Sequence, residues 1–271
     1  MGFNGHVADS TGVKRSLQRR MVVPLLALSA FVAAVDLTVI VGRLLEPEPA
    51  IAAPTATLPP TTTTTAPQPH VPVSTALATP QGAIQTFDAP DGNVIGTAGH
   101  WYGYPMTMPI VEERGAWLRI RLPERPNGST AWVRATDVVA STTTYRIVIR
   151  LGQPNLTVYE SGFPLFTAPA GVGTERTPTA IGNFFVAVIE KPGPRGYGPI
   201  VLDLSGHSEA IESFEGSGDA IIAIHGPISA SSDEQIGTAG TYISNGCIRL
   251  HEEDQLRLDV IPLGTPVDIV A

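Results

Sequence analysis

The chain has 271 residues, which allows one large domain or two smaller ones with additional segments. Its net charge of −8 argues against nucleic acid as a partner, because neutralising phosphates needs a basic surface. Cys247 is the only cysteine, so an intramolecular disulfide and a paired-cysteine zinc site are both excluded. Charged residues are sparse at 15%, while Gly and Pro are frequent, a mixture typical of β-rich domains with many turns.

Residues 1–45 predict a cytoplasmic tail (1–20) followed by a transmembrane signal-anchor (21–45). The tail contains four basic side chains, and the apolar run after it is long enough to cross a bilayer core of ~30 Å. Asp36 disfavours insertion by roughly 2.5–3.5 kcal/mol, but the many Val, Leu, Ile and Phe side chains outweigh it. A cleaved signal peptide is the alternative, although the apolar run is longer than such peptides carry.

Residues 46–81 are dominated by Pro, Thr and Ala, including five consecutive threonines at 61–65. Such a composition lacks the apolar side chains of a core and favours an extended, disordered linker of ~3.1 Å per residue. The segment therefore predicts a tether between the anchor and the rest of the chain.

Residues 82–140 show short alternating strands separated by turns, which predicts a small β-domain. Leu118, Ile120 and Leu122 alternate with arginines, the period of a half-buried strand. The turn signal at 126–128, Pro-Asn-Gly, predicts a hairpin. The stretches Gly-Ala-Trp-Leu-Arg-Ile (115–120) and Asn-Gly-Ser-Thr-Ala-Trp-Val (127–133) resemble a bacterial SH3-like barrel. The two tryptophans in them are either core residues or a wall-binding platform.

Residues 143–271 predict a second, mostly β domain, a sandwich or barrel-like sheet. Alternating or continuous apolar runs indicate six strands, at 145–149, 156–159, 183–189, 200–202, 220–224 and 266–270. The continuous run at 220–224 is typical of a strand buried on both faces. Residues 251–258 are the one stretch with a helical pattern.

Two segments of this domain carry residues suited to nucleophilic catalysis. The apolar strand ends at His225-Gly226, and Cys247 follows in Ser-Asn-Gly-Cys-Ile-Arg-Leu (244–250). A cysteine nucleophile needs a base and an oxyanion site. A histidine at the end of a rigid strand suits the base, and glycine before cysteine leaves backbone N–H groups accessible. A neighbouring imidazolium would lower the thiol pKa from ~8.5 to roughly 3.5–7.5.

Here the sequence resembles the L,D-transpeptidase catalytic (YkuD) family, over the whole of 143–271. The resemblance lies in four stretches: Thr-Pro-Thr-Ala-Ile-Gly-Asn-Phe (177–184), Ile-His-Gly (224–226), Gly-Cys-Ile-Arg-Leu (246–250) and Gly-Thr-Pro-Val (264–267). It implies Cys247 as nucleophile and His225 as general base, with backbone near Gly226 orienting the imidazole. No metal and no organic cofactor is implied.

The resemblance also implies the substrate, the peptidoglycan stem peptide, and a reaction that forms 3→3 cross-links through a cysteine thioester. With water as acceptor the same site would be an L,D-carboxypeptidase. The chain could also be a non-catalytic wall-binding protein or a cysteine peptidase of broader specificity. Carbapenem β-lactams should acylate the cysteine. The predicted anchor places the catalytic domain outside a bacterial cell membrane that the chain crosses once.

Further residues receive secondary roles. Asn245 stands where the family pattern has a histidine, so an orienting or oxyanion role, shared with Gly226 and Gly246, remains open to it but a proton relay does not. Ser244, Arg249 and Tyr197 are candidate substrate contacts. Arg249 has a structural ion pair as its alternative role, and Tyr197 lies in a glycine-rich loop that could act as a lid. His207 is predicted in a loop, with a substrate contact as the alternative.

Overall fold

The computed structural model describes residues 68, 70–194, 196–214, 216–239 and 241–271. The predicted tail and anchor, together with most of the predicted linker, lie outside these residues. In the part of the chain that the structure describes, no helix has the length and apolar character that a membrane crossing requires.

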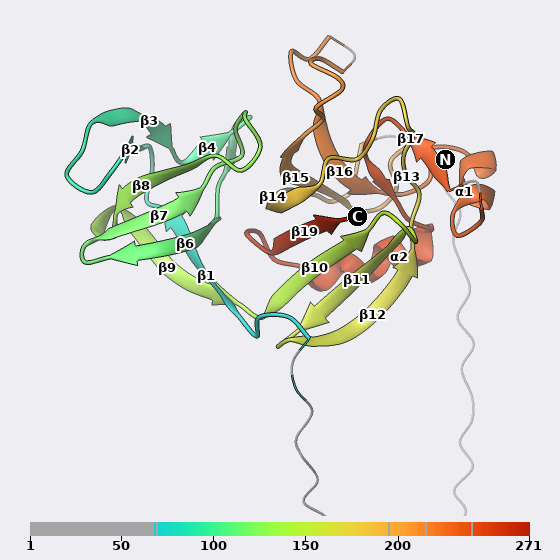
Figure 1. Cartoon of the computed structure of the whole chain (residues 1–271), viewed down its shortest axis with the longest axis horizontal. Coiled ribbons are helices and arrows are strands. Elements are labelled where there is room, and N and C mark those ends of the chain that lie inside the picture. The colour runs from blue at the N-terminus through green and yellow to red at the C-terminus, as the bar shows by residue number, and fades with distance from the viewer. Residues whose placement is uncertain (1–67, 69, 195, 215, 240) are drawn as a thin grey trace, which may run out of the picture. The chain divides into compact units, whose positions relative to one another are not determined.

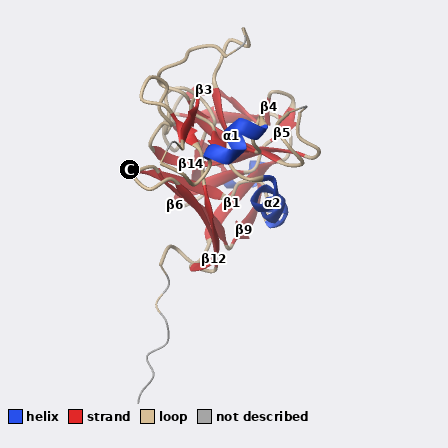
Figure 2. Cartoon of the chain, turned by 90° about the vertical axis from the view of Figure 1, so that its right-hand side faces the viewer, coloured by secondary structure: helices blue, strands red, loops and turns tan. Residues whose placement is uncertain are grey.

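The described chain is mostly β, as predicted from its composition, and its helices are short (Figures 1 and 2). The strands of the first half are β1 (Thr75–Pro80), β2 (Ile84–Phe87), β3 (Val94–Ala98), β4 (His100–Trp101), β5 (Tyr104–Pro105), β6 (Met108–Arg114), β7 (Trp117–Arg121), β8 (Thr130–Arg134) and β9 (Val138–Thr143), with the 3₁₀ turn η1 (Ala135–Asp137). The second half contains β10 (Tyr145–Arg150), β11 (Asn155–Glu160), β12 (Phe163–Pro169), β13 (Val172–Gly173), β14 (Gly182–Glu190), β15 (Val201–His207), β16 (Ile221–His225), α1 (Ala230–Gln235), β17 (Tyr242–Ser244), β18 (Ile248–Arg249), α2 (Glu252–Leu256), η2 (Arg257–Val260) and β19 (Pro266–Val270).

Strands β1 to β9 form the amino-terminal β-domain. Seven of them make one sheet in the order β3-β2-β8-β7-β6-β1-β9, and β4 pairs with β5 in a separate hairpin. The predicted hairpin is confirmed, since β7 and β8 pair antiparallel on either side of the turn at 122–129. Trp117 and Trp132 are buried against Phe87, which identifies them as core residues rather than an exposed binding platform. The SH3-like resemblance of this domain stays a prediction.

Strand β1 lies inside the range predicted as linker. It pairs antiparallel with β9 over six residues, from Thr75 opposite Thr143 to Pro80 opposite Val138, and also pairs with β6. Leu77 and Ala78 are buried in the process. The local Pro and Thr content predicted a tether. The strand could not be predicted from this segment, because it forms by pairing with residues that lie 30 to 68 positions further along the chain.

Strands β10 to β19 form the carboxy-terminal β-domain. Its main sheet has the order β12-β11-β10-β19-β14-β15-β16-β18, with parallel pairs β10–β19 and β16–β18. Each of the six runs predicted as strands falls on an observed strand, and the helical stretch contains α2 and η2. Helix α1 has no counterpart in the predictions. Its single turn and a half begins with a capping box between Ser229 and Ser232, a local signal without apolar periodicity.

Strand β14 contributes to the cores of both domains. Phe184 and Val186 point into the core of the carboxy-terminal domain, while Phe185 and Ala187 belong to the hydrophobic cluster of the amino-terminal domain. Because successive side chains of a strand point to opposite faces, one strand can join two cores in this way. Phe185 is fully buried, so this contact between the domains excludes water.

Candidate active site

Two cavities meet at Cys247. The first, of about 180 Å³, is lined by Cys247 together with His225, Asn245 and Arg249. The second, of about 530 Å³, is lined by residues that include Cys247, Ala223 and Asp203. The structure thus brings together the nucleophile and the base predicted from the sequence, although they lie 22 positions apart.

Sheet pairing explains why these two residues meet. Strand β16 ends at His225 and pairs in parallel with β18, with Ile224 opposite Ile248 and His225 opposite Arg249. Cys247 immediately precedes β18, two positions before Arg249, the partner of His225. The Cys247 thiol donates a weak hydrogen bond to the Ile221 carbonyl, with 3.9 Å between sulfur and oxygen.

The imidazole of His225 is fixed by its own neighbour in the chain. Its Nδ1 lies 2.7 Å from the Gly226 carbonyl oxygen. A carbonyl only accepts hydrogen bonds, so Nδ1 carries the proton and Nε2 of the neutral ring is left as an acceptor. The ring also packs edge-on against Tyr197, with 4.7 Å between ring centroids. A neutral imidazole held in this tautomer is equipped to accept a proton at Nε2.

The turn that presents Cys247 is held by the hydroxyl groups of two buried residues. Ser244 Oγ accepts a hydrogen bond from Gly246 N–H at 3.1 Å and donates one to the Cys247 carbonyl at 2.6 Å. Thr179 Oγ1 donates to the Gly246 carbonyl at 2.9 Å. Gly246 has φ +119°, a conformation open essentially to glycine alone. Ser244, predicted as a substrate contact, is therefore 2% exposed and committed to the turn.

Hydrogen bonds within the site limit which backbone N–H groups can donate to an oxyanion. Gly246 N–H is taken by Ser244, and Gly226 N–H donates to the Tyr197 carbonyl at 2.9 Å. These two predicted donors are therefore engaged, and Gly226 acts on the base through its carbonyl instead. In the described part of the chain, the N–H of Cys247 itself has no such partner, which leaves it as the backbone donor beside the thiol.

Burial governs the ionisation of both reactive groups. It raises the pKa of the Cys247 thiol, and the charge of Asp203 acts in the same direction. It lowers the pKa of His225 to about 4. The free site therefore holds a neutral thiol and a neutral imidazole, which differs from the imidazolium-activated thiol predicted from the sequence. The reason is that a site closed from water disfavours both charged forms.

Arg249 and Asn245 lie at the first cavity. Burial lowers the pKa of the Arg249 guanidinium, yet arginine remains a cation at neutral pH. Its Nε is buried and has no hydrogen-bond partner among the described residues. Asn245 is exposed at the rim, where its Oδ1 accepts a long hydrogen bond of 3.4 Å from Thr177. Asn245 can therefore turn toward a bound substrate.

Asp203 is a feature of the site that the sequence-based reasoning did not identify. Burial raises the pKa of this carboxyl to about 7, and the nearby charge of Glu190 adds to the effect. Glu190 and Asp219 line the same cavity. In the sequence Asp203 is one polar residue within an alternating strand, where an inward-facing acid cannot be told from an outward-facing one. Pairing of β15 with β14 and β16 decides that Asp203 faces the cavity.

The loop that carries Tyr197 is anchored by a buried amide. Gln255, on α2, is fully buried and donates from Nε2 to the carbonyls of Tyr197 (2.8 Å) and Ile200. The carbonyl of Tyr197 also accepts from Gly226, as described above. These contacts hold the Tyr197 main chain against the end of β16.

His207 is not a loop residue, contrary to the prediction. It ends strand β15 and is 2% exposed. Ser205, Gly206 and Ser208 beside it suggested a loop because small polar residues favour turns. They are buried here because this end of β15 packs against residues from the amino-terminal β-domain.

The carboxy-terminal segment is similar to known protein families. Residues 144–269 match the model of the L,D-transpeptidase catalytic domain, YkuD. Two proteins named as candidate L,D-transpeptidases YkuD match the same part of the chain, one from Bacillus licheniformis (36% identical over 127 residues) and one from Bacillus subtilis (30% over 126 residues). Each match covers 46% of this chain and 65% of the relative, so less than two thirds of the relatives' length is represented.

Solved structures give weaker likenesses. L,D-transpeptidase 3 from Mycobacterium tuberculosis, in complex with a faropenem-derived adduct, is 15% identical with a TM-score of 0.40, covering 70% of this chain and 93% of that chain. The catalytic domain of the E. faecium L,D-transpeptidase is 21% identical with a TM-score of 0.34, covering 46% of this chain and 95% of that chain.

Proposed function

We propose, from the match of residues 144–269 to the L,D-transpeptidase catalytic domain (YkuD), that the protein is a peptidoglycan L,D-transpeptidase with Cys247 as nucleophile and His225 as general base. The observation that carries the proposal is the cavity shared by these two side chains, with Nδ1 of His225 committed to the Gly226 carbonyl.

In the proposed first half-reaction, the sulfur of Cys247 attacks the carbonyl carbon of the third residue of a stem tetrapeptide. The thiol proton passes to Nε2 of His225 as the bond forms, because the resting thiol is not ionised. The oxyanion accepts a hydrogen bond from Cys247 N–H. Collapse breaks the bond to the terminal D-Ala, His225 returns the proton to the leaving amine, and a thioester remains.

In the second half-reaction, a side-chain amine of a neighbouring stem attacks the thioester and gives up a proton to His225. The thiolate leaves, is reprotonated, and the product is a 3→3 cross-link. The second cavity suits an amine as acceptor. Glu190, and Asp203 in its ionised form, place negative charge in the cavity that Cys247 also lines, and this charge attracts an ammonium group before it loses a proton to become the attacking amine. With water as acceptor, the same acyl-enzyme gives L,D-carboxypeptidation.

Arg249 is proposed to bind the terminal carboxylate of the donor stem. A cation with a buried, unpaired Nε at the cavity wall gains most from an incoming anion. Asn245 is proposed to orient the substrate by an amide hydrogen bond. A single-pass anchor at 21–45 with the catalytic domain outside the membrane fits this substrate, and that location stays part of the proposal.

The test is incubation of the full-length protein with purified disaccharide-tetrapeptide, read by mass spectrometry, with Cys247→Ala as control. A dimer lacking one D-Ala, formed by the wild type alone, is the expected product. Tripeptide monomer without dimer would mean carboxypeptidation. Unchanged substrate, with retained binding to isolated cell walls by both proteins, would favour a non-catalytic wall-binding protein.

Carbapenem acylation gives a second test, because the strained carbonyl of these β-lactams resembles the donor bond. The wild type should gain the mass of one carbapenem, and Cys247→Ala should not. An adduct that persists in Cys247→Ala would contradict the assignment of the nucleophile.

A further inference from the structure

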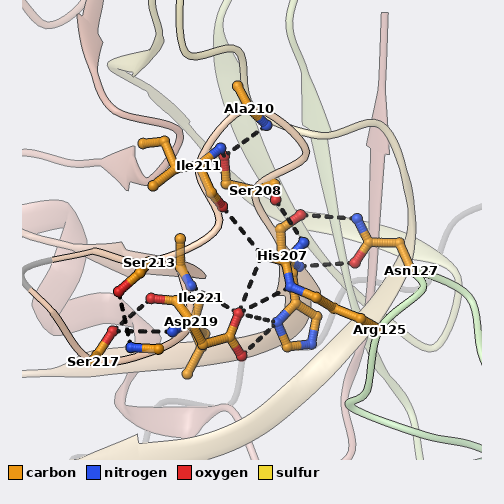
Figure 3. A network of polar contacts seen from close by, with 12 residues as sticks. Arg125, Asn127, His207, Ser208, Ala210, Ile211, Ser213, Ser217, Asp219 and Ile221 are labelled. Carbon is orange, nitrogen blue, oxygen red and sulfur yellow. Dashed lines mark hydrogen bonds and ion pairs between the residues drawn. The ribbon is translucent and has the colours of Figure 1, made fainter.

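Two turns of the amino-terminal β-domain contact the segment that forms a wall of the proposed active site. The turn after β7 carries Arg125 and Asn127, and the β4–β5 turn carries Tyr102. Their side chains contact the end of β15 and the β15–β16 loop, which comprises residues 208–214 and 216–220 in the described chain. Figure 3 shows the arrangement around His207 and Asp219.

Asn127 holds the last residue of β15 by its main chain. Its Nδ2 donates to the His207 carbonyl and its Oδ1 accepts from the His207 N–H, both at 2.8 Å (Figure 3). The side-chain amide thus substitutes for a neighbouring strand at the point where β15 ends. The carbonyl of Pro123, from the same turn, lies 3.2 Å from Nε2 of His207.

Asp219 gathers hydrogen bonds from both domains. Its carboxylate accepts from His207 Nδ1 (2.9 Å), from Tyr102 OH (3.1 Å) and from Arg125 Nε (3.2 Å), as well as from the N–H of Ala220 (2.7 Å). Burial tends to raise the pKa of Asp219, but the hydrogen bonds outweigh it and the pKa lies below its ordinary value. The carboxylate is therefore charged, and both ring nitrogens of His207 face groups that only accept.

Arg125 also holds the main chain of the β15–β16 loop. Its two terminal nitrogens donate to the carbonyls of Ser208 (2.9 Å) and Ile211 (3.2 Å), while its side chain pairs with Asp219. At 41% side-chain exposure, the ion pair alone contributes little. Arg125 constrains the loop more strongly through its geometry, because one planar guanidinium contacts Ser208 and Ile211 near one end of the loop and Asp219 near the other.

The loop held in this way forms a wall of both cavities at Cys247. Ile211, Phe214 and Ala220 line the cavity that contains His225, and Phe214 and Asp219 line the second cavity. The strand that continues from the loop supplies the Ile221 carbonyl to which the Cys247 thiol donates. A shift of the loop would therefore alter both substrate walls and the surroundings of the sulfur.

Tyr102 lies in the wall of the second cavity itself, although it belongs to the other domain. It adopts φ +48°, which is unusual for a residue with a side chain and costs energy. Adjacent Trp101 packs edge-on against the His207 ring, with 6.3 Å between centroids. The strained turn thus keeps Trp101 against the His207 ring and Tyr102 at the second cavity.

We propose that the amino-terminal β-domain completes the active site: Arg125 and Asn127 are positioning residues that fix the β15–β16 loop, and Tyr102 is a specificity residue for the acceptor stem. This inference rests on the proposed function. It assigns to the domain a direct part in catalysis, in place of a spacing or wall-binding role alone. The buried Phe185 contact between the two domains gives Arg125 and Asn127 a rigid support.

The test uses full-length Arg125→Ala and Asn127→Ala, with Arg114→Ala as the matched control, since Arg114 is an exposed arginine whose contacts with Glu112 and the Trp132 ring lie within the same domain. The second-order rate of carbapenem acylation is measured per folded protein, with hydrogen exchange of residues 208–220. Arg125→Ala and Asn127→Ala should both be acylated about 10- to 100-fold more slowly, since small misplacements at a reacting centre slow reactions by factors of this order. Exchange at Ile211 and Ala220 should rise, and the control should match the wild type.

Tyr102→Ala separates the specificity role from the positioning role. It should leave acylation within about threefold of the wild type, while raising KM for the acceptor stem about tenfold or more in the cross-linking assay. Arg125→Lys, which keeps the charge but loses the fork, supplies the comparison if Arg125→Ala does not fold. It should be slowed by an intermediate factor.

Acylation rates and hydrogen exchange equal to those of the wild type, in folded Arg125→Ala and Asn127→Ala, would overturn the inference. Absence of acylation in the wild type would instead count against the proposed function, so the two failures are distinguishable. An unchanged KM for the acceptor in Tyr102→Ala would remove Tyr102 from the site and leave the positioning residues to be judged on acylation alone.

Discussion

Asp203→Asn should stabilise the protein in a pH-dependent way. A pKa of about 7 in the folded protein, against an ordinary 3.8, means that the folded state keeps this proton to a higher pH than the unfolded chain. The free energy of unfolding of the wild type therefore falls as pH rises from about 4 to about 7 and is level above that. The difference between the two pKa values corresponds to about 4 kcal/mol at full ionisation, an upper figure because the cavity admits water.

The measurement is urea unfolding of both proteins at pH 4 and pH 8. The variant should be close to the wild type at pH 4 and more stable by up to about 4 kcal/mol at pH 8. Asp91→Asn, an exposed turn substitution, should show no such trend. A stability difference for Asp203→Asn that is the same at both pH values would refute the reasoning. Above pH 7 the variant should also be acylated faster, because the Asp203 charge no longer raises the pKa of Cys247.

Three further outcomes follow from the geometry. Acylation should fall as pH drops through about 4, where His225 becomes protonated and cannot accept the thiol proton; rates measured from pH 3.5 to 6 that stay flat would contradict this. Gly246→Ala should destabilise by roughly 1–3 kcal/mol in urea unfolding, because its φ of +119° strains any side chain, with a parallel loss of acylation. Phe185→Ala should cost about 3–5 kcal/mol of unfolding free energy, whereas Phe163→Ala, 39% exposed, should cost much less.

The sequence could point to Cys247 and His225 as a candidate catalytic pair because the signal for each residue is local. An apolar run that ends in His-Gly indicates a buried strand with a polar residue at its tip, and Gly-Cys within Ser-Asn-Gly-Cys-Ile-Arg-Leu marks a turn next to a strand. Periodicity then predicted six of the ten strands from β10 to β19, since alternation is imposed on each strand by its own two faces. The family match of residues 144–269 agrees with this interpretation.

The ionisation of the pair could not be predicted in the same way. Whether a thiol and an imidazole form an ion pair depends on how much water and which charges surround them, and those neighbours come from distant strands. Asp203, on β15, affects Cys247 on the far side of a cavity. The commitment of the Gly226 and Gly246 N–H groups to other acceptors is likewise a result of folding.

The sequence by itself determined the β-rich class and singled out the candidate nucleophile and base, because these follow from composition and short-range pattern. Only the tertiary structure decided that Thr75–Pro80 is a strand and that His207 is buried. It also decided that Tyr102 lines a cavity at Cys247, and that Arg125 and Asn127 hold the end of β15 and the loop after it. Each of these depends on groups more than twenty positions away, and a polar residue in an alternating segment gives no sign of which distant partner will meet it. The physical reason is that hydrogen bonds and burial between segments are set by the packing of whole sheets, which local propensity does not encode.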